Sequence, residues 1–285
     1  MLQMPEYNRV ANVTGSSSGF GLLTSVELAK AGFRVIASMR DLGRRKLLDN
    51  AAKSAGVDEK IDVRQLDVTN FAAIPEFVER VVRDYGRVDV LLNNAGFAVA
   101  GFIEDLKLEE IRAQFETNFF GHVAMTKAVL PVMRQQRSGH IMMVSSISGL
   151  HGSPTISSYS ASKHALEGWS ESLRIEVNSL GIKVVLVEPG SFQTDIWTRN
   201  AYIGEKTRDG TSLNRERGER MRDRVQKLRK QDPIIVARRV AQIAQDPNPR
   251  LRYVIGSDAH VQLWMKRILP WKVYEKLIAR ALEID

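Results

Sequence analysis

Short apolar segments alternate with segments of helical length from residue 9 onward, and this alternation limits the folds open to the chain more than any other feature. Strands that alternate with helices along a chain form parallel sheets, which helices cover on both faces. Apolar runs such as VVLV and VDVLL fit that arrangement, because a strand buried on both faces need not alternate apolar with polar residues. We therefore predict an α/β fold with a doubly wound parallel sheet.

The element pattern also shows where the regular repeat is interrupted. The predicted strands span Arg9–Val13, Phe33–Ser38, Ile61–Leu66, Val88–Leu92, His140–Val144, Ile182–Val187 and Arg252–Ile255. The predicted helices span Gly19–Ala31, Asp41–Ala55, Phe71–Tyr85, Leu108–Arg137 and Ser157–Leu180. After Pro189–Gly190, residues 191–232 are polar and basic and show no clear strand. Because a strand pattern returns afterwards, we interpret this segment as an insertion and not as a second domain.

Charge and cysteine content exclude several classes of protein. The chain has 41 Lys and Arg and 33 Asp and Glu, which gives a net charge of +8. Between Arg199 and Arg239 there are 13 Lys and Arg but only 6 Asp and Glu, so the remainder is nearly neutral and no nucleic-acid partner is expected. With no cysteine, and five histidines that lack the spacing of a metal site, we expect no bound metal.

The two ends of the chain carry little targeting information. The N-terminal sequence MLQMPEYNRV lacks the apolar stretch of a signal peptide, and no uncharged apolar run reaches the ~20 residues that span a bilayer. We therefore expect a soluble, cytoplasmic protein. The tail at 264–278 is amphipathic and carries two tryptophans, so it could lie on a membrane surface, close a pocket or pack on a sheet edge. We do not favour peripheral membrane contact among these alternatives.

The first predicted strand runs into a glycine-rich turn, Thr14–Gly21, which a helix follows directly. Glycines at 15, 19 and 21 let such a turn tighten and let a pyrophosphate approach its backbone. The helix N-terminus then offers free N–H groups and the positive end of the helix dipole. A glycine-rich turn without a ligand is the alternative interpretation, but the strand–turn–helix setting favours a dinucleotide site and a Rossmann-type sheet.

The end of the second predicted strand bears on the kind of dinucleotide. An acidic residue usually stands there to hold the ribose 2′-hydroxyl, but this strand ends Ala37-Ser38-Met39 and is followed by Arg40. A guanidinium suits a 2′-phosphate through charge-assisted hydrogen bonds. Asp41 is expected to cap the next helix instead. We favour NADP(H) over NAD(H); a solvated surface cation is the alternative interpretation of Arg40.

A second group of residues suggests proton transfer. In the sequence YSASK, Tyr159 and Lys163 are four apart, so on a helix they share one face. A phenol has a pKa of about 10, and a neighbouring cation together with an oxidised nicotinamide could lower it by about three units, roughly 4 kcal/mol, toward neutrality. The spacing alone also fits a surface Tyr and Lys. However, Ser145-Ser146 and Asn93–Gly96 follow central strands, where side chains point into the ligand crevice of such a sheet.

The order of these motifs resembles the short-chain dehydrogenase/reductase family. The matching pieces are TGSSSGFG at 14–21, LDV at 66–68, NNAG at 93–96, Asn118 in TNFFG, the serines at 145–146, YSASK at 159–163 and EPGSFQT at 188–194. They extend from residue 9 to about 195, some two-thirds of the chain. The pattern is most similar to the branch of retinol and hydroxysteroid dehydrogenases.

The resemblance implies a role for each matched residue. Tyr159 would be the general acid/base, and Lys163 would activate it and bind the nicotinamide ribose. Ser146, in preference to Ser145, would form a hydrogen bond with the substrate oxygen. Asn118 would support a water relay to the lysine. The catalytic set is thus Asn118, Ser146, Tyr159 and Lys163. The cofactor set is Gly15, Ser17, Ser18, Gly19, Phe20, Gly21, Arg40, Asp67, Val68, Asn93, Ala95, Gly96, Tyr159, Lys163, Pro189, Gly190, Phe192 and Thr194.

We accordingly expect one Rossmann-type domain over residues 1–285. Residues 1–195 would form the cofactor and catalytic core, 196–232 a basic lid over the substrate, and 233–285 the last helix, the last strand and the amphipathic tail. The expected reaction interconverts a carbonyl and an alcohol on a lipophilic small molecule. Apolar wall residues of the substrate pocket are expected among Phe97, Val99, Leu150, Ile196 and Trp197, with ordinary core packing as the equal alternative for each of them. The resemblance also implies a homodimer or homotetramer, assembled through the helices at 108–137 and 157–180.

One alternative from another functional class stays open. The chain could be an NADP(H)-sensing protein that uses its basic segment to bind a nucleic acid or a protein. The complete Ser–Tyr–Lys set argues against this, because a sensor does not need all three residues. The mixed-sign run at 215–230 favours a solvated helix face over a site that attracts an anionic cofactor or an acidic substrate.

Overall fold

A seven-stranded parallel sheet forms the centre of the molecule, as the sequence predicted. The computed structural model describes residues 9–197, 200–227 and 230–283, so the N-terminal segment 1–8 lies outside the described residues. The strand order is β3-β2-β1-β4-β6-β7-β9, and every neighbouring pair is parallel. The strands of this sheet are β1 (Val10–Thr14), β2 (Arg34–Met39), β3 (Ile61–Gln65), β4 (Val90–Asn93), β6 (Gly139–Val144), β7 (Ile182–Pro189) and β9 (Arg252–Ile255).

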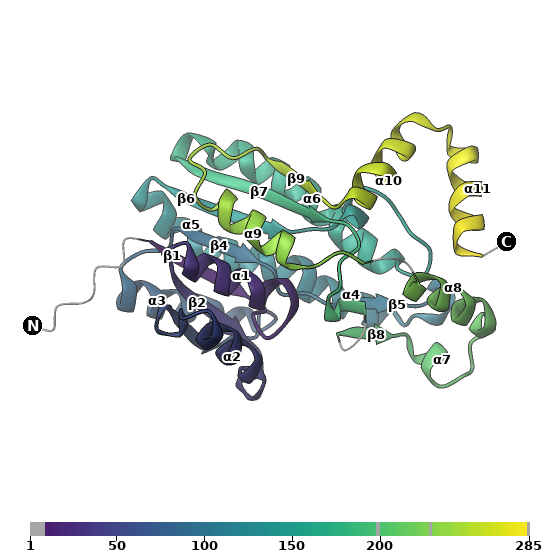
Figure 1. The fold of residues 1–285 in the computed structure, drawn as a ribbon, viewed down its shortest axis with the longest axis horizontal. Helices are drawn as coiled ribbons and strands as arrows, with labels where there is room; N and C mark the ends of the chain where they lie inside the picture. The colour runs from purple at the N-terminus through teal and green to yellow at the C-terminus, as the bar shows by residue number, and fades with distance from the viewer. Residues whose placement is uncertain (1–8, 198–199, 228–229, 284–285) are drawn as a thin grey trace, which may run out of the picture.

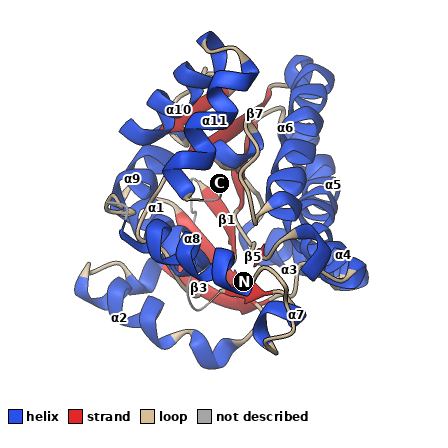
Figure 2. Cartoon of the chain, turned by 90° about the vertical axis from the view of Figure 1, so that its right-hand side faces the viewer, coloured by secondary structure: helices blue, strands red, loops and turns tan. Residues whose placement is uncertain are grey.

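Helices cover the sheet on both sides (Figures 1 and 2). The helices of the described residues are α1 (Gly19–Lys30), α2 (Lys46–Ser54), α3 (Ile74–Tyr85), α4 (Leu108–Phe115), α5 (Gly121–Gln136), α6 (Ser157–Val177), α7 (Glu205–Arg208), α8 (Arg215–Lys227), α9 (Ile234–Ile243), α10 (Ser257–Ile268) and α11 (Trp271–Leu282); α7, α8 and α11 lie away from the sheet. Successive residues of a strand belong to opposite cores: Val35 packs on the side of α1 and α9, and Ile36 on the side of α3 and α5. The apolar strands are therefore buried on both faces.

The predicted helical stretch at 108–137 is confirmed, but it is not one regular α-helix. It consists of α4, a π-helical turn at Glu116–Phe120, and α5. Such π-turns insert one residue into an α-helix and occur frequently at functional sites. Here the turn contains Asn118, a predicted site residue. Helical periodicity alone does not reveal this extra residue.

The insertion at 191–232 does contain a strand, contrary to the prediction. Strand β8 (Ala201–Ile203) pairs in parallel with β5 (Ala98–Ala100) and forms a separate two-stranded sheet. Its three residues are too few to produce a strand pattern in the sequence. Further contacts join the insertion to the body: Lys107 pairs with Glu205 at 2.5 Å, and the Ser212 hydroxyl donates to Asp105 at 2.7 Å. The segment is thus tied to β5 and to the residues between β5 and α4.

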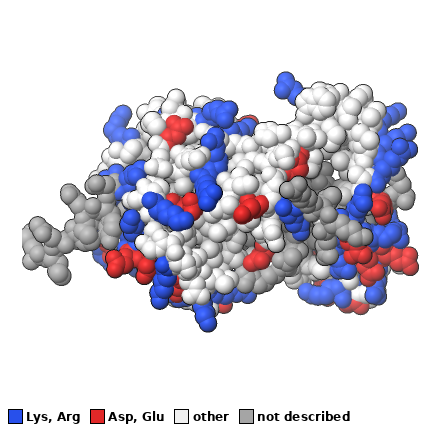
Figure 3. All heavy atoms as spheres, viewed as in Figure 1, with Lys and Arg blue, Asp and Glu red and all other residues white. Residues whose placement is uncertain are grey.

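Helix α8 has the mixed surface that its sequence indicates. Arg215 pairs with Glu219 at 3.0 Å along the helix, and both side chains are at least half exposed. Figure 3 shows acidic and basic side chains intermingled at the right-hand end of the molecule, where Figure 1 places α7 and α8. Exposed pairs of this kind are worth little to stability, so their main effect is to solvate the helix face.

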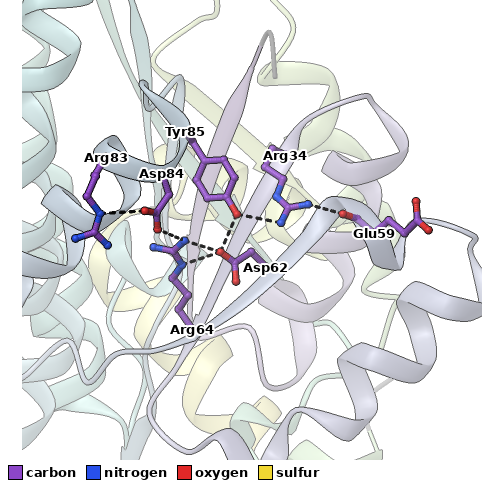
Figure 4. A network of polar contacts seen from close by, with 7 residues as sticks. All are labelled: Arg34, Glu59, Asp62, Arg64, Arg83, Asp84 and Tyr85. Atoms are coloured by element: carbon purple, nitrogen blue, oxygen red, sulfur yellow. Dashed lines mark hydrogen bonds and ion pairs between the residues drawn. The ribbon is translucent and has the colours of Figure 1, made fainter. Parts of the chain in front are cut away.

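A polar network secures the edge of the sheet at β3 (Figure 4). Arg64 lies between Asp62 and Asp84, at 2.7 and 2.8 Å. Tyr85, at the end of α3, donates its hydroxyl hydrogen to Asp62 at 2.9 Å and accepts a hydrogen bond from Arg34 of β2 at 2.9 Å. Charged side chains on an edge strand also discourage pairing with another chain. The network holds β2 and β3 together, and the carboxyl ends of these strands lead to Arg40 and Asp67.

The C-terminal tail folds as α10 and α11, which project from the body in Figure 1. The Lys266 ammonium donates to the Leu150 carbonyl at 2.6 Å, while Trp264 and Trp271 are more than 60% exposed. None of the helices within the described ranges is long and apolar enough to cross a bilayer. Assembly through the predicted oligomer helices stays a prediction; Phe120 and Ile175 on that part of the surface are exposed apolar side chains.

Candidate active site

A cleft of about 620 Å³ opens at the carboxyl ends of the strands, and it is lined by most of the residues that the sequence singled out. From the predicted set it includes Gly15, Ser17, Ser18, Gly19, Phe20, Arg40, Asp67, Val68, Ala95, Gly96, Ser146, Tyr159, Lys163, Pro189, Gly190, Phe192 and Thr194. Three predicted residues, Gly21, Asn93 and Asn118, lie behind this lining. The carboxyl end of a parallel sheet is the usual place for a ligand in such folds.

Two turns meet at the floor of the cleft. The Thr14 hydroxyl accepts hydrogen bonds from the backbone N–H groups of Asn94 and Ala95, both at 3.0 Å, and the Asn94 amide donates to the Thr14 carbonyl at 2.8 Å. A Cβ on Gly15 would lie 2.7 Å from the Ala95 Cα, and one on Gly21 would lie 2.4 Å from the Gly15 carbonyl oxygen. Glycine is therefore required at both positions for the two turns to approach this closely.

Asn93, which was predicted to border the adenosine half of the cofactor, lies behind the lining of the cleft, whereas its neighbour Asn94 lines it. Asn93 is fully buried, and its amide donates to Thr126 at 3.0 Å. Asn93 and Asn94 differ in this way because successive side chains of a strand point to opposite sides. Asn93 therefore joins β4 to α5, whereas Asn94 holds the glycine-rich turn.

The cleft extends to a basic region beyond β2. Arg40 lines it, and so does Arg44, which the sequence analysis did not select. Asp41 caps the short turn that carries Arg44, as predicted, by accepting from the Gly43 N–H at 2.8 Å. Its carboxylate lies 3.7 Å from the Arg44 guanidinium and is 62% exposed. Two guanidinium groups thus border the cleft, and spacing in the sequence did not show that the second would turn back toward it.

Tyr159 and Lys163 lie one turn apart on α6, as their spacing predicted, and each is only 4% exposed. The Lys163 ammonium is 5.7 Å from the centre of the Tyr159 ring. Burial raises the pKa of Tyr159 to about 12, and a hydrogen bond with Ser146 acts in the opposite direction. In the chain alone, the pKa of Tyr159 is therefore raised, not lowered as its spacing from Lys163 had suggested. The phenol is protonated at neutral pH.

The Lys163 side chain is buried, which disfavours its positively charged form. Burial lowers its pKa to about 8, while the negative charge of Glu167 raises it. The ammonium donates to the Val144 carbonyl at 2.7 Å, at the end of the strand that leads to Ser146. Ser146 is the N-cap of a short helical turn and accepts from the Ser148 N–H at 3.1 Å. Strand β6 and helix α6 therefore place the serine, the phenol and the ammonium at one point of the cleft.

Asn118 and His122 support the site from behind. The Asn118 amide accepts from the Phe97 N–H at 3.1 Å, donates to the Phe97 carbonyl at 3.0 Å and donates to Ser162 at 3.3 Å, next to Lys163. The buried His122 side chain contacts the Ala95 carbonyl at 2.8 Å through Nε2, and burial lowers its pKa to about 3. It is therefore neutral. A lone histidine in an apolar helix gave no sequence signal for this position.

The segment after β7 forms the opposite wall. Phe192 packs edge-to-face on Phe20, with ring centres 5.8 Å apart. A Cβ on Gly190 would lie 2.6 Å from the Asp258 carboxylate, which accepts from the Ser191 N–H at 2.8 Å. The carboxylate at the start of α10 thus fixes the turn that follows Pro189. Asp258 lies far along the chain from this turn, so no local sequence pattern links the two.

The mouth of the cleft includes some of the predicted apolar wall. Phe97 and Ile196 line it, together with Thr117, Ala201 and Tyr202, which had not been predicted. Val99 is buried in β5, in line with the alternative that it belongs to the core, and Leu150 is not among the residues that line the cleft. The side chain of Trp197 lies outside the described residues. Asn200 donates to the Ser18 hydroxyl at 3.4 Å, which brings the insertion to the glycine-rich turn.

The residues present fit a dinucleotide. Helix α1 begins at Gly19, and its N-cap Ser18 makes no side-chain capping bond among the described residues, so N–H groups of the first turn are available to a pyrophosphate. The missing side chains at Gly15 and Gly19 leave backbone exposed along the same wall. No group of three His, Asp or Glu side chains that could hold a metal occurs in the described part of the chain.

Comparison with known proteins gives consistent results. The sequence profile of the short chain dehydrogenase family matches residues 9–202. An uncharacterized oxidoreductase of Bacillus subtilis, YusZ, is 41% identical over 96% of this chain and 98% of its own length. The 3-ketodihydrosphingosine reductase of Bacteroides thetaiotaomicron is 44% identical over 68% of each protein. Human retinol dehydrogenase 8 is 43% identical over 66% of this chain and 60% of that protein.

Solved structures show the same fold. A short-chain dehydrogenase from Streptomyces avermitilis superposes with a TM-score of 0.80 and 34% identity, covering 94% of this chain and 95% of that protein. A metagenomic short-chain oxidoreductase in complex with NADP superposes with a TM-score of 0.69 and 26% identity, covering 87% of this chain and 96% of that protein.

Proposed function

This chain belongs to the short-chain dehydrogenase family, and from that premise we propose that it is an NADP(H)-dependent enzyme that interconverts a carbonyl and an alcohol on a lipophilic substrate. The family establishes an NAD(P)-dependent oxidoreductase. The finer statements on cofactor, substrate and residues are ours. The observation that carries the proposed reaction is the meeting of Ser146, Tyr159 and Lys163 at the wall of the cleft.

In the proposed reduction, the chain supplies a hydrogen-bond donor and a proton. Ser146 and Tyr159 both direct a hydroxyl to the substrate oxygen, which stabilises the negative charge that develops on it. The Tyr159 hydroxyl, protonated at neutral pH, then gives its proton to that oxygen. When bound, the nicotinamide cofactor supplies or accepts the hydride. Lys163 favours the tyrosinate that remains, because its ammonium lies beside the ring.

We assign the remaining predicted residues to support of this step. Asn118 holds the backbone at Phe97 and contacts Ser162, so it joins the Phe97 segment to the helix that carries Lys163; its role in a water relay stays a prediction. Gly15, Ser17, Gly19 and Phe20 would contact the pyrophosphate side of the dinucleotide, Asp67 and Val68 the adenine, and Pro189, Gly190, Phe192 and Thr194 the nicotinamide. All of them border the cleft.

The first prediction concerns Tyr159. We expect Tyr159→Phe to abolish turnover, because general acid catalysis is worth about 10²–10⁴-fold and the variant has no proton to give. Dinucleotide binding, measured by quenching of protein fluorescence, is expected to stay within about threefold, since only one hydroxyl is lost. Turnover at a rate close to that of the wild type would exclude Tyr159 as the acid.

The second prediction concerns NADP(H) over NAD(H). Arg40 and Arg44 both border the cleft, and a guanidinium there would bind a 2′-phosphate. Replacing Arg40 by Asp should shift the ratio of kcat/KM for NADPH and NADH toward NADH by about 10–100-fold, because charge-assisted hydrogen bonds contribute about 1.5–3 kcal/mol each. Arg83→Asp, at an exposed position outside the cleft, serves as the control for net charge. An unchanged ratio in the Arg40 variant would refute the assignment.

The third prediction concerns the substrate. Phe97, Ile196 and Tyr202 form an apolar mouth, and two similar proteins are named for lipophilic substrates, a ketodihydrosphingosine and a retinol. In a screen of carbonyls and alcohols with both cofactors, kcat/KM should rise with chain length by several-fold for each methylene buried, at about 0.8 kcal/mol apiece. A preference for short or charged carbonyls would contradict this. Absence of turnover together with salt-sensitive nucleic-acid binding would favour the sensing alternative instead.

A further inference from the structure

A buried carboxylate, Glu167, follows Lys163 by one turn of α6. Tyr159, Lys163 and Glu167 are spaced four apart, so all three lie along one face of the helix. The Glu167 side chain is 6% exposed, and it is the group whose negative charge raises the pKa of the buried Lys163. The row formed by Tyr159 and Lys163 on α6 therefore continues to a buried carboxylate.

Contacts from two other elements fix the Glu167 carboxylate. The Ser145 hydroxyl donates to its Oε1, and the Arg252 guanidinium pairs with its Oε2. Ser145 directly precedes Ser146, and its backbone N–H donates to the Val187 carbonyl at 2.8 Å. Arg252 is the first residue of β9, so it lies beyond residue 202, where the family profile ends. Both oxygens of the carboxylate are thus held from outside the catalytic helix.

We propose that Glu167 is a positioning residue that supplies the counter-charge keeping Lys163 an ammonium, and that Arg252 holds Glu167 in place. The inference deepens the proposed function and rests on the role assigned there to Lys163. A buried ammonium without a partner would lose its proton instead of staying charged in an apolar surrounding. Glu167 prevents this without occupying the cleft, which is left to substrate and cofactor.

The other charged groups around the site do not replace Glu167. His122 faces Lys163 from α5 and is neutral, since burial lowers its pKa to about 3. Glu188 of β7 contacts the same Arg252 nitrogen at 2.5 Å, but burial and the charge of Glu167 raise its pKa to about 7. Glu171 contacts Arg252 at 2.5 Å and is 53% exposed, so water screens its charge. Strand β6 brings the uncharged Val144 carbonyl and Ser145.

Two substitutions on α6 separate a charge effect from a loss of packing. Glu167→Gln keeps the shape and an acceptor for Ser145 but removes the charge beside Lys163. Glu171→Gln, one turn further along, also removes one carboxylate from Arg252 but leaves Glu167 unchanged, so it is the matched control. The Lys163 pKa is read from the ¹³Cε resonance of labelled lysine in the cofactor-free protein, assigned with Lys163→Met. Unfolding midpoints confirm that each variant is folded.

We expect the Lys163 pKa to fall by at least about one unit in Glu167→Gln, because a unit charge one helical turn away acts at low effective dielectric. The Glu171 control should retain the wild-type value. The pH dependence of carbonyl reduction should change in the same way. As pH rises, an ammonium with a lower pKa loses its proton sooner, so kcat/KM should begin to decline at a lower pH in the Glu167 variant and not in the Glu171 control. At pH 6 the two variants should differ less.

An unchanged Lys163 pKa in Glu167→Gln, or an equal fall in Glu171→Gln, would overturn the proposal. If Glu167→Gln does not fold, Glu167→Asp serves in its place, because it moves the carboxylate away by one methylene. The Lys163 pKa should then fall by a smaller amount. An unchanged Lys163 pKa in this variant would again overturn the proposal. Failure of the proposed function is distinguishable, because it would show as missing turnover in the wild type while the resonance of Lys163 still reports its charge.

Discussion

The site depends on one electrostatic constraint, which is that an ammonium must stay charged beside a buried phenol. Burial acts against both groups: it lowers the pKa of Lys163 to about 8 and raises that of Tyr159 to about 12. Helix α6 places the two side chains next to each other, because residues four apart share a face of a helix. Glu167, one turn deeper, supplies the opposite charge. The chemistry proposed for the cleft therefore depends on charges arranged along a single helix.

The parallel sheet brings the remaining parts to that helix. Each strand ends at the same edge, so β1 delivers the glycine-rich turn, β4 the turn at Asn94, β6 Ser146 and β7 Pro189. Contacts between these strand ends leave no room for side chains at Gly15 and Gly21. The last strand, β9, adds Arg252 from outside the family-matched segment. Residues widely separated in sequence thus meet at one cleft because the strands that carry them end at one edge of the sheet.

Much of this arrangement could be predicted from the sequence, and the exceptions have physical reasons. Strands and helices in βα units repeat clearly, and Tyr159 with Lys163 requires only helical spacing. By contrast, the π-turn at Asn118 adds a residue that periodicity does not show, and the short strand β8 exists only through its pairing with β5. Arg44 and Arg252 reach the site through tertiary folding, so no local pattern marks them.

The account is tested most directly by the ionisation of Tyr159 in the presence of cofactor. The ¹³Cζ resonance of labelled tyrosine reports this pKa, with assignment by Tyr159→Phe, in wild type and in Lys163→Met, with and without NADP⁺. We predict a pKa above 10 in the free protein and a fall of about two to three units when NADP⁺ binds, only where Lys163 is present. A Tyr159 pKa that stays above 10 with NADP⁺ bound, or that falls equally in Lys163→Met, would contradict the account.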